Sequence, residues 1–139
     1  MRFFNLLSLL FFICSCQPLP RNEVLIGAWK VDSTYMYYNR FSYTDRKGGP
    51  DWAVYVYDSI GVMKEVKFDS YQTYFYELKG DSMMVRPTQG GDDIRFEILE
   101  LEKDRLILKK KKQPVFKGEN QERYEIRFLS RTVVPEDLG

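Results

Sequence analysis

Alternating or apolar-rich runs follow one another from residue 24 to residue 132, and turn residues separate them. No helical period longer than two turns interrupts these runs, and a period of two is typical of β-strands. The pattern predicts eight strands, at residues 25–37, 52–58, 61–68, 71–78, 82–86, 93–101, 105–111 and 122–130.

The connections between these strands are short. Segments 58–61, 79–81 and 102–104 read as tight turns, and 87–93 and 113–120 read as loops. Because no crossover helix fits between neighbouring strands, we expect antiparallel pairing. The predicted fold is therefore all-β: a single eight-stranded antiparallel up-and-down β-barrel, whose closure removes exposed sheet edges and leaves a small lumen.

The longest connection inside the domain is segment 39–51, which carries Phe41, Tyr43 and the pair Gly48 and Gly49. A long loop with aromatic residues is often a lid or a binding loop. The alternative is a solvated connection whose aromatic side chains lie against the rim of the barrel.

The first 15 residues predict a cleaved signal peptide, with one basic residue, Arg2, before an apolar stretch at 6–13. That stretch is too short to span a bilayer. The junction Ile13-Cys14-Ser15-Cys16 resembles the bacterial lipobox, which implies that Cys16 carries the lipid. We expect a lipidated tether at 16–23, the barrel at 24–132 and a tail at 133–139.

Composition excludes several classes of site. The chain has no His, and its two Cys precede the predicted domain, so we expect no His-based or thiol catalysis, no metal site and no disulfide. Lys and Arg number 21 against 20 Asp and Glu, which lacks the basic excess of a nucleic-acid-binding protein. No nucleophile stands beside a base at motif spacing, so we expect neither an enzyme nor a cofactor.

Gly27 and Trp29 form a Gly-x-Trp motif at the start of the first predicted strand. With the strand count, this motif resembles the lipocalin family, and most of all the lipocalin-like lipoproteins of Bacteroidetes-type bacteria. The resemblance implies that Trp29 lies across the closed end of the barrel, with an Arg of the last strand over its indole. Arg127 is the candidate, with Arg123 and Arg131 as alternatives. The chain is shorter than typical secreted lipocalins, lacks their disulfide and shows no convincing C-terminal helix.

Tyrosines dominate several predicted strands. Tyr35 and Tyr37 share the Trp29 face, because side chains alternate along a strand, and Tyr55 and Tyr57 alternate on the second strand, as Tyr74 and Tyr76 do on the fourth. We predict that Tyr35, Tyr37, Tyr55 and Tyr57 line a lumen for a small lipophilic ligand, with Phe41 and Tyr43 at its opening. The alternative is that the tyrosines fill the core or cover the outer face.

Two charged motifs have a functional and a structural interpretation. The run 109–112 (KKKK) could contact anionic lipid headgroups, or it could be a solvated strand end that suppresses edge pairing. The carboxylates of 90–93 (GGDD) could bind Ca²⁺, but a simple turn accounts for them better because too few oxygen ligands lie nearby.

Together these features predict a lipid-anchored β-barrel of the cell envelope, bound to the outer membrane through Cys16 and facing the periplasm. Gln17 after the lipidated Cys, and the absence of an acidic run in the tether, support that location. The expected function is binding of a small apolar or amphipathic molecule. The alternative is a structural lipoprotein with a filled barrel that docks another envelope component; no particular protein partner is predicted.

Overall fold

The computed structural model describes residues 19–46, 52–68, 70–118 and 120–138. The predicted signal peptide, Cys16 and the pair Gly48 and Gly49 lie outside these residues. The elements are α1 (Arg21–Leu25), β1 (Gly27–Tyr38), β2 (Phe41–Asp45), β3 (Val54–Tyr57), β4 (Val62–Lys67), β5 (Ser70–Lys79), β6 (Ser82–Pro87), β7 (Ile94–Leu101), β8 (Arg105–Lys111), β9 (Arg123–Thr132) and the 3₁₀-helix η1 (Glu136–Leu138).

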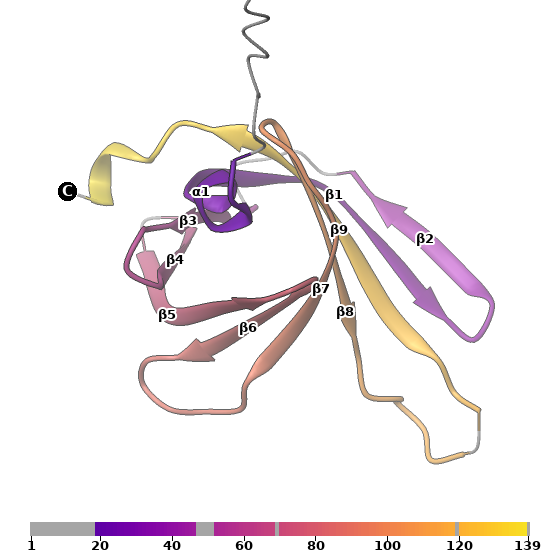
Figure 1. Cartoon of the computed structure of the whole chain (residues 1–139). Helices are drawn as coiled ribbons and strands as arrows, with labels where there is room; N and C mark the ends of the chain where they lie inside the picture. The colour runs from indigo at the N-terminus through magenta and orange to yellow at the C-terminus, as the bar shows by residue number, and fades with distance from the viewer. Residues whose placement is uncertain (1–18, 47–51, 69, 119, 139) are drawn as a thin grey trace, which may run out of the picture.

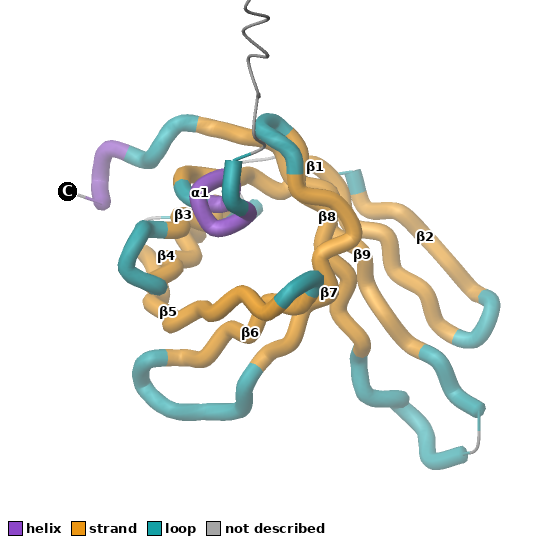
Figure 2. The backbone as a smooth tube through the Cα atoms, in the orientation of Figure 1, coloured by secondary structure: helices purple, strands orange, loops and turns teal. Residues whose placement is uncertain are grey.

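Eight of the strands form a closed antiparallel barrel, as the sequence predicts (Figures 1 and 2). Strand β1 pairs with β3, each strand from β3 to β8 pairs with its successor, and β9 returns to β1. The closing seam runs from Ala28 opposite Thr132 to Tyr38 opposite Arg123. Closure satisfies the backbone hydrogen bonds that open edges would leave exposed, so the barrel needs no second layer.

Strand β2 was not predicted and corrects the interpretation of segment 39–51 as one loop. Asn39 and Arg40 have positive φ angles, 43° and 76°, and turn the chain back on itself. Phe41 then lies opposite Tyr38, and Asp45 opposite Thr34. Two positive φ angles define the tight hairpin turn whose twist matches the flanking strands, and Asn is favoured there. The β1–β2 hairpin extends away from α1 as a lip beyond the barrel (Figure 1).

One end of the barrel is closed by α1 and packed side chains. Leu25 of α1, Trp29, Met83 and Leu106 are fully buried in the core at this end. Arg21 donates a hydrogen bond to the Gly80 carbonyl in the β5–β6 turn and pairs with Asp81. The tether predicted over 16–23 is therefore wrong for 21–23, which form the first part of a helix that docks on the barrel.

The opposite end is open, and Lys110 near the end of β8 and Glu125 near the start of β9 lie on the inner face there. A β-bulge between Val31 and Ser33 interrupts the alternation of β1. Beyond the bulge, Thr34 and Met36, not Tyr35 and Tyr37, lie opposite the inward residues Arg127 and Glu125 of β9.

In the described part of the chain, no helix has the length and apolarity needed to cross a membrane.

Candidate functional site

The Gly-x-Trp motif forms the closed end of the barrel. The Trp29 side chain is 0% exposed, and its indole N–H donates a 2.8 Å hydrogen bond to the Leu25 carbonyl. The guanidinium carbon of Arg131 lies 3.9 Å from the centre of the indole ring. A cation held this close over an aromatic face is stabilising, so both groups serve the fold.

Arg131, not Arg127, is therefore the arginine over Trp29, which corrects the sequence-based choice. Arg131 also donates hydrogen bonds to the carbonyls of Val24, Ile26 and Lys103, at 2.6, 2.7 and 3.0 Å. These bonds connect the end of β9 to α1 and to the β7–β8 turn. One side chain therefore joins three chain segments at the closed end.

Gly27 is required by this arrangement. Its φ is +121°, a conformation that residues with a side chain rarely adopt. A Cβ at this position would lie 2.6 Å from Nη1 of Arg131, closer than nonbonded atoms approach. Gly27, Trp29 and Arg131 thus form one structural unit, and none of them faces the open part of the lumen.

The half of the lumen next to the open end contains a cavity of about 170 Å³. Its walls are largely apolar and aromatic, and its polar groups gather at the mouth. The lining residues are Tyr55, Tyr57, Met63, Glu65, Tyr74, Val85, Ile94, Phe96, Leu108, Lys110 and Arg127. Ligand cavities are typically about 300–1,000 Å³, whereas an apolar cavity of about 150 Å³ accepts benzene. The lumen therefore has room for one ring or a short chain.

Tyr55 and Tyr57 lie in this cavity, as predicted. The Tyr55 hydroxyl accepts a 2.9 Å hydrogen bond from Nη1 of Arg127. Burial raises the pKa of Tyr55 to about 12, although the nearby Arg127 lowers it in part. Burial also raises the pKa of Tyr57, whose ring packs edge-on against Tyr76 with centroids 5.1 Å apart. Both phenols keep their protons at neutral pH, so they can donate hydrogen bonds but cannot act as bases.

Tyr35 and Tyr37 lie on the outer face, so their predicted place in the lumen is wrong. The bulge in β1 shifts the alternation by one residue, and every side chain beyond it changes face. Tyr37 stacks on Tyr124, with centroids 4.8 Å apart, and Lys109 lies 4.5 Å from the centre of the Tyr124 ring. These tyrosines cover the outside of the β1–β9 seam.

Phe41 and Tyr43 project from the lip and are not laid over the barrel. They are 80% and 65% exposed, and they line a mainly apolar groove of about 350 Å³ together with Tyr38 and Val115. Because residues 41–45 pair with β1 along the sheet, the predicted lid is wrong for this part of the segment.

An ion cluster occupies the inner face of β9 at the mouth. Glu125 is 4% exposed; its Oε1 accepts a 2.7 Å hydrogen bond from Arg127, and its Oε2 lies 2.9 Å from Nζ of Lys112. Burial alone would raise the pKa of Glu125, but Arg127 and Lys112 lower it below its ordinary value. Burial would likewise lower the pKa of Arg127, but Tyr55 and Glu125 raise it. Glu125 and Arg127 are therefore both charged at neutral pH.

The lysine run 109–112 divides between the two faces of β8 and its continuation. Lys110 lies opposite Glu125 and lines the cavity, and Lys109 and Lys111 lie opposite the outward residues Ile126 and Tyr124. The sequence interpretations, lipid contact or solvated strand end, treated the four residues as one patch. Alternation along the strand from Leu106 and Leu108 is the signal that places Lys110 inside.

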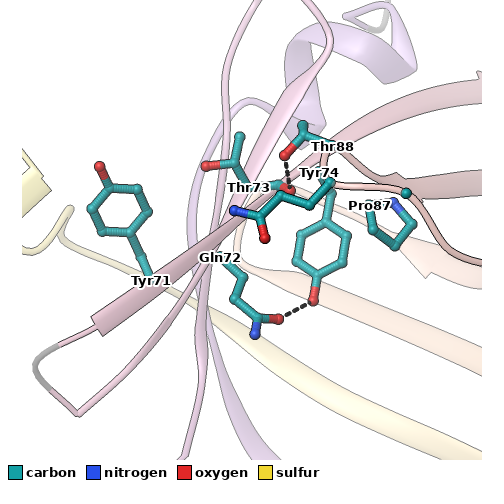
Figure 3. Close-up of a pocket in the computed structure, with 8 residues that line it drawn as sticks. Tyr71, Gln72, Thr73, Tyr74, Pro87 and Thr88 are labelled. Atoms are coloured by element: carbon teal, nitrogen blue, oxygen red, sulfur yellow. Dashed lines mark hydrogen bonds between the residues drawn. The ribbon is translucent and has the colours of Figure 1, made fainter.

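A second, more polar groove of about 470 Å³ lies between the start of β5 and segment 87–90 (Figure 3). Thr88 donates a hydrogen bond to the Thr73 carbonyl at 3.0 Å, and Tyr74 donates one to Gln72 at 2.7 Å. Because these polar side chains already have partners within the protein and the groove is open to solvent, it is a weaker binding site than the lumen.

The carboxylate pair of segment 90–93 has a structural partner. Nε and Nη2 of Arg86 donate hydrogen bonds of 2.8 and 2.9 Å to the two oxygens of Asp93. This fork-to-fork pair holds the β6–β7 loop at its base. Within the described residues, no group of three or more acidic side chains is placed to hold a metal ion.

Comparison with a solved lipocalin-like structure supports the fold. A lipocalin-like protein from Bacteroides uniformis ATCC 8492 superposes with a TM-score of 0.54 at 12% sequence identity, over 78% of this chain and 99% of that one. An uncharacterized protein from Bacteroides eggerthii DSM 20697 gives a TM-score of 0.49 at 12% identity, over 77% of this chain and 98% of that one. No protein-family model matches the chain, and no curated protein matches it. The chain is thus a lipocalin-like barrel by structure.

Proposed function

We propose that this protein is a lipid-anchored barrel of the bacterial cell envelope that binds a small apolar or amphipathic molecule in the mouth of its lumen. The proposal rests on the observation that the lumen is only partly filled by side chains. The closed end is packed by Trp29 and its neighbours, whereas the mouth retains an apolar cavity with a few polar groups at one end. That combination is typical of sites that orient a small ligand.

A binding role fits the polar groups of the mouth better than catalysis does. Arg127 and Glu125 hold each other in a buried pair, and Tyr55 has a pKa of about 12. None of these three offers a base or nucleophile poised near neutral pH. Fixed charges and a hydroxyl donor can instead select and orient a bound molecule.

Filling the cavity tests the binding role. Ile94→Trp replaces an aliphatic side chain that lines the cavity with a larger aromatic one. It should abolish binding of benzamide, a probe the size of one ring. Arg95→Trp is the matched control, because the adjacent side chain is exposed and should leave binding unchanged. Ligand-observed NMR of the full chain in detergent micelles, with empty micelles as the blank, measures the difference. Equal benzamide signals from both variants would rule out the lumen as the site.

The alternative, a docking protein with no soluble ligand, draws support from one observation. Phe41, Tyr43 and Val115 expose apolar surface around the groove on the lip, away from the lumen. If the unmodified protein takes up no benzamide in the same experiment, this alternative becomes the better account of the barrel.

Lipid anchoring at Cys16 is part of the proposal and rests on the lipobox resemblance. We expect a clickable fatty-acid analogue fed to cells to label the protein, because two or more acyl chains are needed for durable anchoring. Cys16→Ser should remove the label and release the protein from the membrane fraction, and Cys14→Ser is the matched control that should keep both. Labelling of the Cys16→Ser protein would contradict the proposed anchor.

The proposed anchor fits the position of the cavity. Leu19 lies two residues before α1, which closes the barrel, so a lipid on Cys16 places the closed end toward the membrane. Three residues span at most about 11 Å. The mouth would then face the aqueous side, which in the proposed outer-membrane location is the periplasm, and it would exchange ligand with water.

A further inference from the structure

The mouth of the lumen carries more positive than negative charge. Glu65 lines the cavity and pairs with Lys67 at 2.8 Å, and Glu125 is shared by Arg127 and Lys112. Lys110 adds a further cation to the lining. The charged residues that line the cavity are thus one carboxylate and two cations, and with their ion-pair partners the mouth has two carboxylates for four cations.

Lys110 is the cation without a counter-ion. Among the residues that the structure describes, its ammonium makes no ion pair, and it lies over the Phe96 ring, whose centre is 5.9 Å from Nζ. Both oxygens of Glu125, the residue opposite Lys110, are already taken by Arg127 and Lys112. Burial and the nearby Arg127 lower the pKa of Lys110, which is the expected sign for a cation that lacks a partner.

Tyr55 contributes an unused donor to the same cavity. Its hydroxyl oxygen accepts the hydrogen bond from Arg127, and in the described part of the chain its own O–H donates to no acceptor. The polar end of the cavity thus presents an ammonium and a phenolic O–H. A negatively charged acceptor with two oxygens would satisfy both.

Building on the proposed binding function, we infer that the ligand is a small apolar carboxylate, with its carboxylate on Lys110 and Tyr55 and its ring or short chain against Met63, Val85 and Phe96. The single unpaired cation of the lining matches one negative charge. The volume of about 170 Å³ limits the apolar part to about one ring. A long acyl chain would not fit inside.

Benzoate and benzamide test this inference, because they have the same ring and differ in charge. The full chain in micelles should bind benzoate about tenfold more tightly than benzamide, a difference of about 1.4 kcal/mol. Lys110→Met should lower benzoate affinity until it equals the affinity of the same variant for benzamide, which removes the preference. Lys111→Met, on the outer face of the same strand, is the matched control and should keep the preference. Lys110→Gln should behave like Lys110→Met and guards against an effect of the methionine side chain.

The possible outcomes distinguish the inference that the ligand is a carboxylate from the broader proposal that the lumen binds a small molecule. Equal affinity of the unmodified protein for benzoate and benzamide would overturn the carboxylate inference and leave the binding function standing. Failure to bind either compound would overturn both. A benzoate preference that survives in Lys110→Met and Lys110→Gln would show that another cation is responsible. Thermal unfolding of each variant verifies folding, and loss of an unpaired half-buried charge should not lower the Tm.

Discussion

Replacing Trp29 with alanine is expected to lower the free energy of unfolding by about 3–5 kcal/mol, the usual range for truncating a buried aromatic side chain. Trp29 is 0% exposed, and it joins three parts of the closed end. Its indole N–H bonds to Leu25 of α1, and its ring lies beneath Arg131 of β9. The truncation leaves a cavity, an unpaired carbonyl and an arginine without its aromatic partner.

Urea unfolding of the full chain, followed by far-UV circular dichroism, measures this loss. Phe41→Ala is the matched control, because the Phe41 ring is 80% exposed and its removal should change stability by no more than about 0.5 kcal/mol. Since small domains have only about 5–15 kcal/mol in total, Trp29→Ala can unfold part of the population at 37 °C. A midpoint no lower than that of Phe41→Ala would show that Trp29 does not hold the closed end.

The alternation of apolar and polar residues was enough to predict the eight strands of the barrel. Two irregularities in the first strand and its connection made the predicted faces and the predicted loop wrong. Tight turns after β3, β5 and β7 carry residues typical of turns, so the alternation between them could be followed. The bulge between Val31 and Ser33 has no glycine and no other local sequence signal, yet it moves Tyr35 and Tyr37 to the outside. The hairpin turn at Asn39 and Arg40 lacks the glycine that usually marks such turns, so β2 was hidden.

The arginine over Trp29 could have been identified from topology. Arg123, Arg127 and Arg131 all lie on the inner face of β9, so alternation alone does not distinguish them. However, Trp29 stands near the start of β1, and β9 runs antiparallel to β1. The residue nearest the end of β9, Arg131, must therefore lie nearest to Trp29.

The ion cluster was harder to predict because the inner face of β9 is the more polar one. Glu125 and Arg127 face the lumen, and Ile126 and Phe128 face outward. The usual rule that apolar side chains face the core would place Ile126 and Phe128 inside and the charged residues outside. The inner face near an open end can carry charged side chains when they form ion pairs. The pairing of Glu125 with Arg127 and Lys112 becomes visible only once the strands are placed in register.

Neutralising Glu125 is expected to have the second large effect. Removing one partner of a buried ion pair typically costs about 3–5 kcal/mol, because the remaining charge stays buried without compensation. Glu125→Gln keeps the shape of the side chain and leaves both Arg127 and Lys112 without their carboxylate. We therefore expect a loss of stability of that order at pH 7.

The pH dependence distinguishes the charge of Glu125 from its packing. The neighbouring cations hold the pKa of Glu125 below its ordinary value of 4.5 in the folded protein. A carboxyl group with a lowered folded-state pKa stabilises the protein fully above its unfolded pKa, and this stabilisation is lost as the pH falls through the folded-state pKa. Unmodified protein should therefore lose stability as the pH falls below about 4.5, and Glu125→Gln should lose less over the same range.

Urea unfolding from pH 7 to pH 3 tests this expectation, with Asp93→Asn as the matched control. Asp93 also has a pKa lowered by an arginine, Arg86, but their pair is exposed to solvent. Water screens an exposed pair, so Asp93→Asn should change stability much less at pH 7. The curves of the unmodified protein and Glu125→Gln should converge as the pH falls, because protonation removes the same charge that the substitution removes. Parallel curves would contradict this expectation. They would mean that Glu125 stabilises the barrel through its shape and hydrogen bonds and that its negative charge adds nothing to stability.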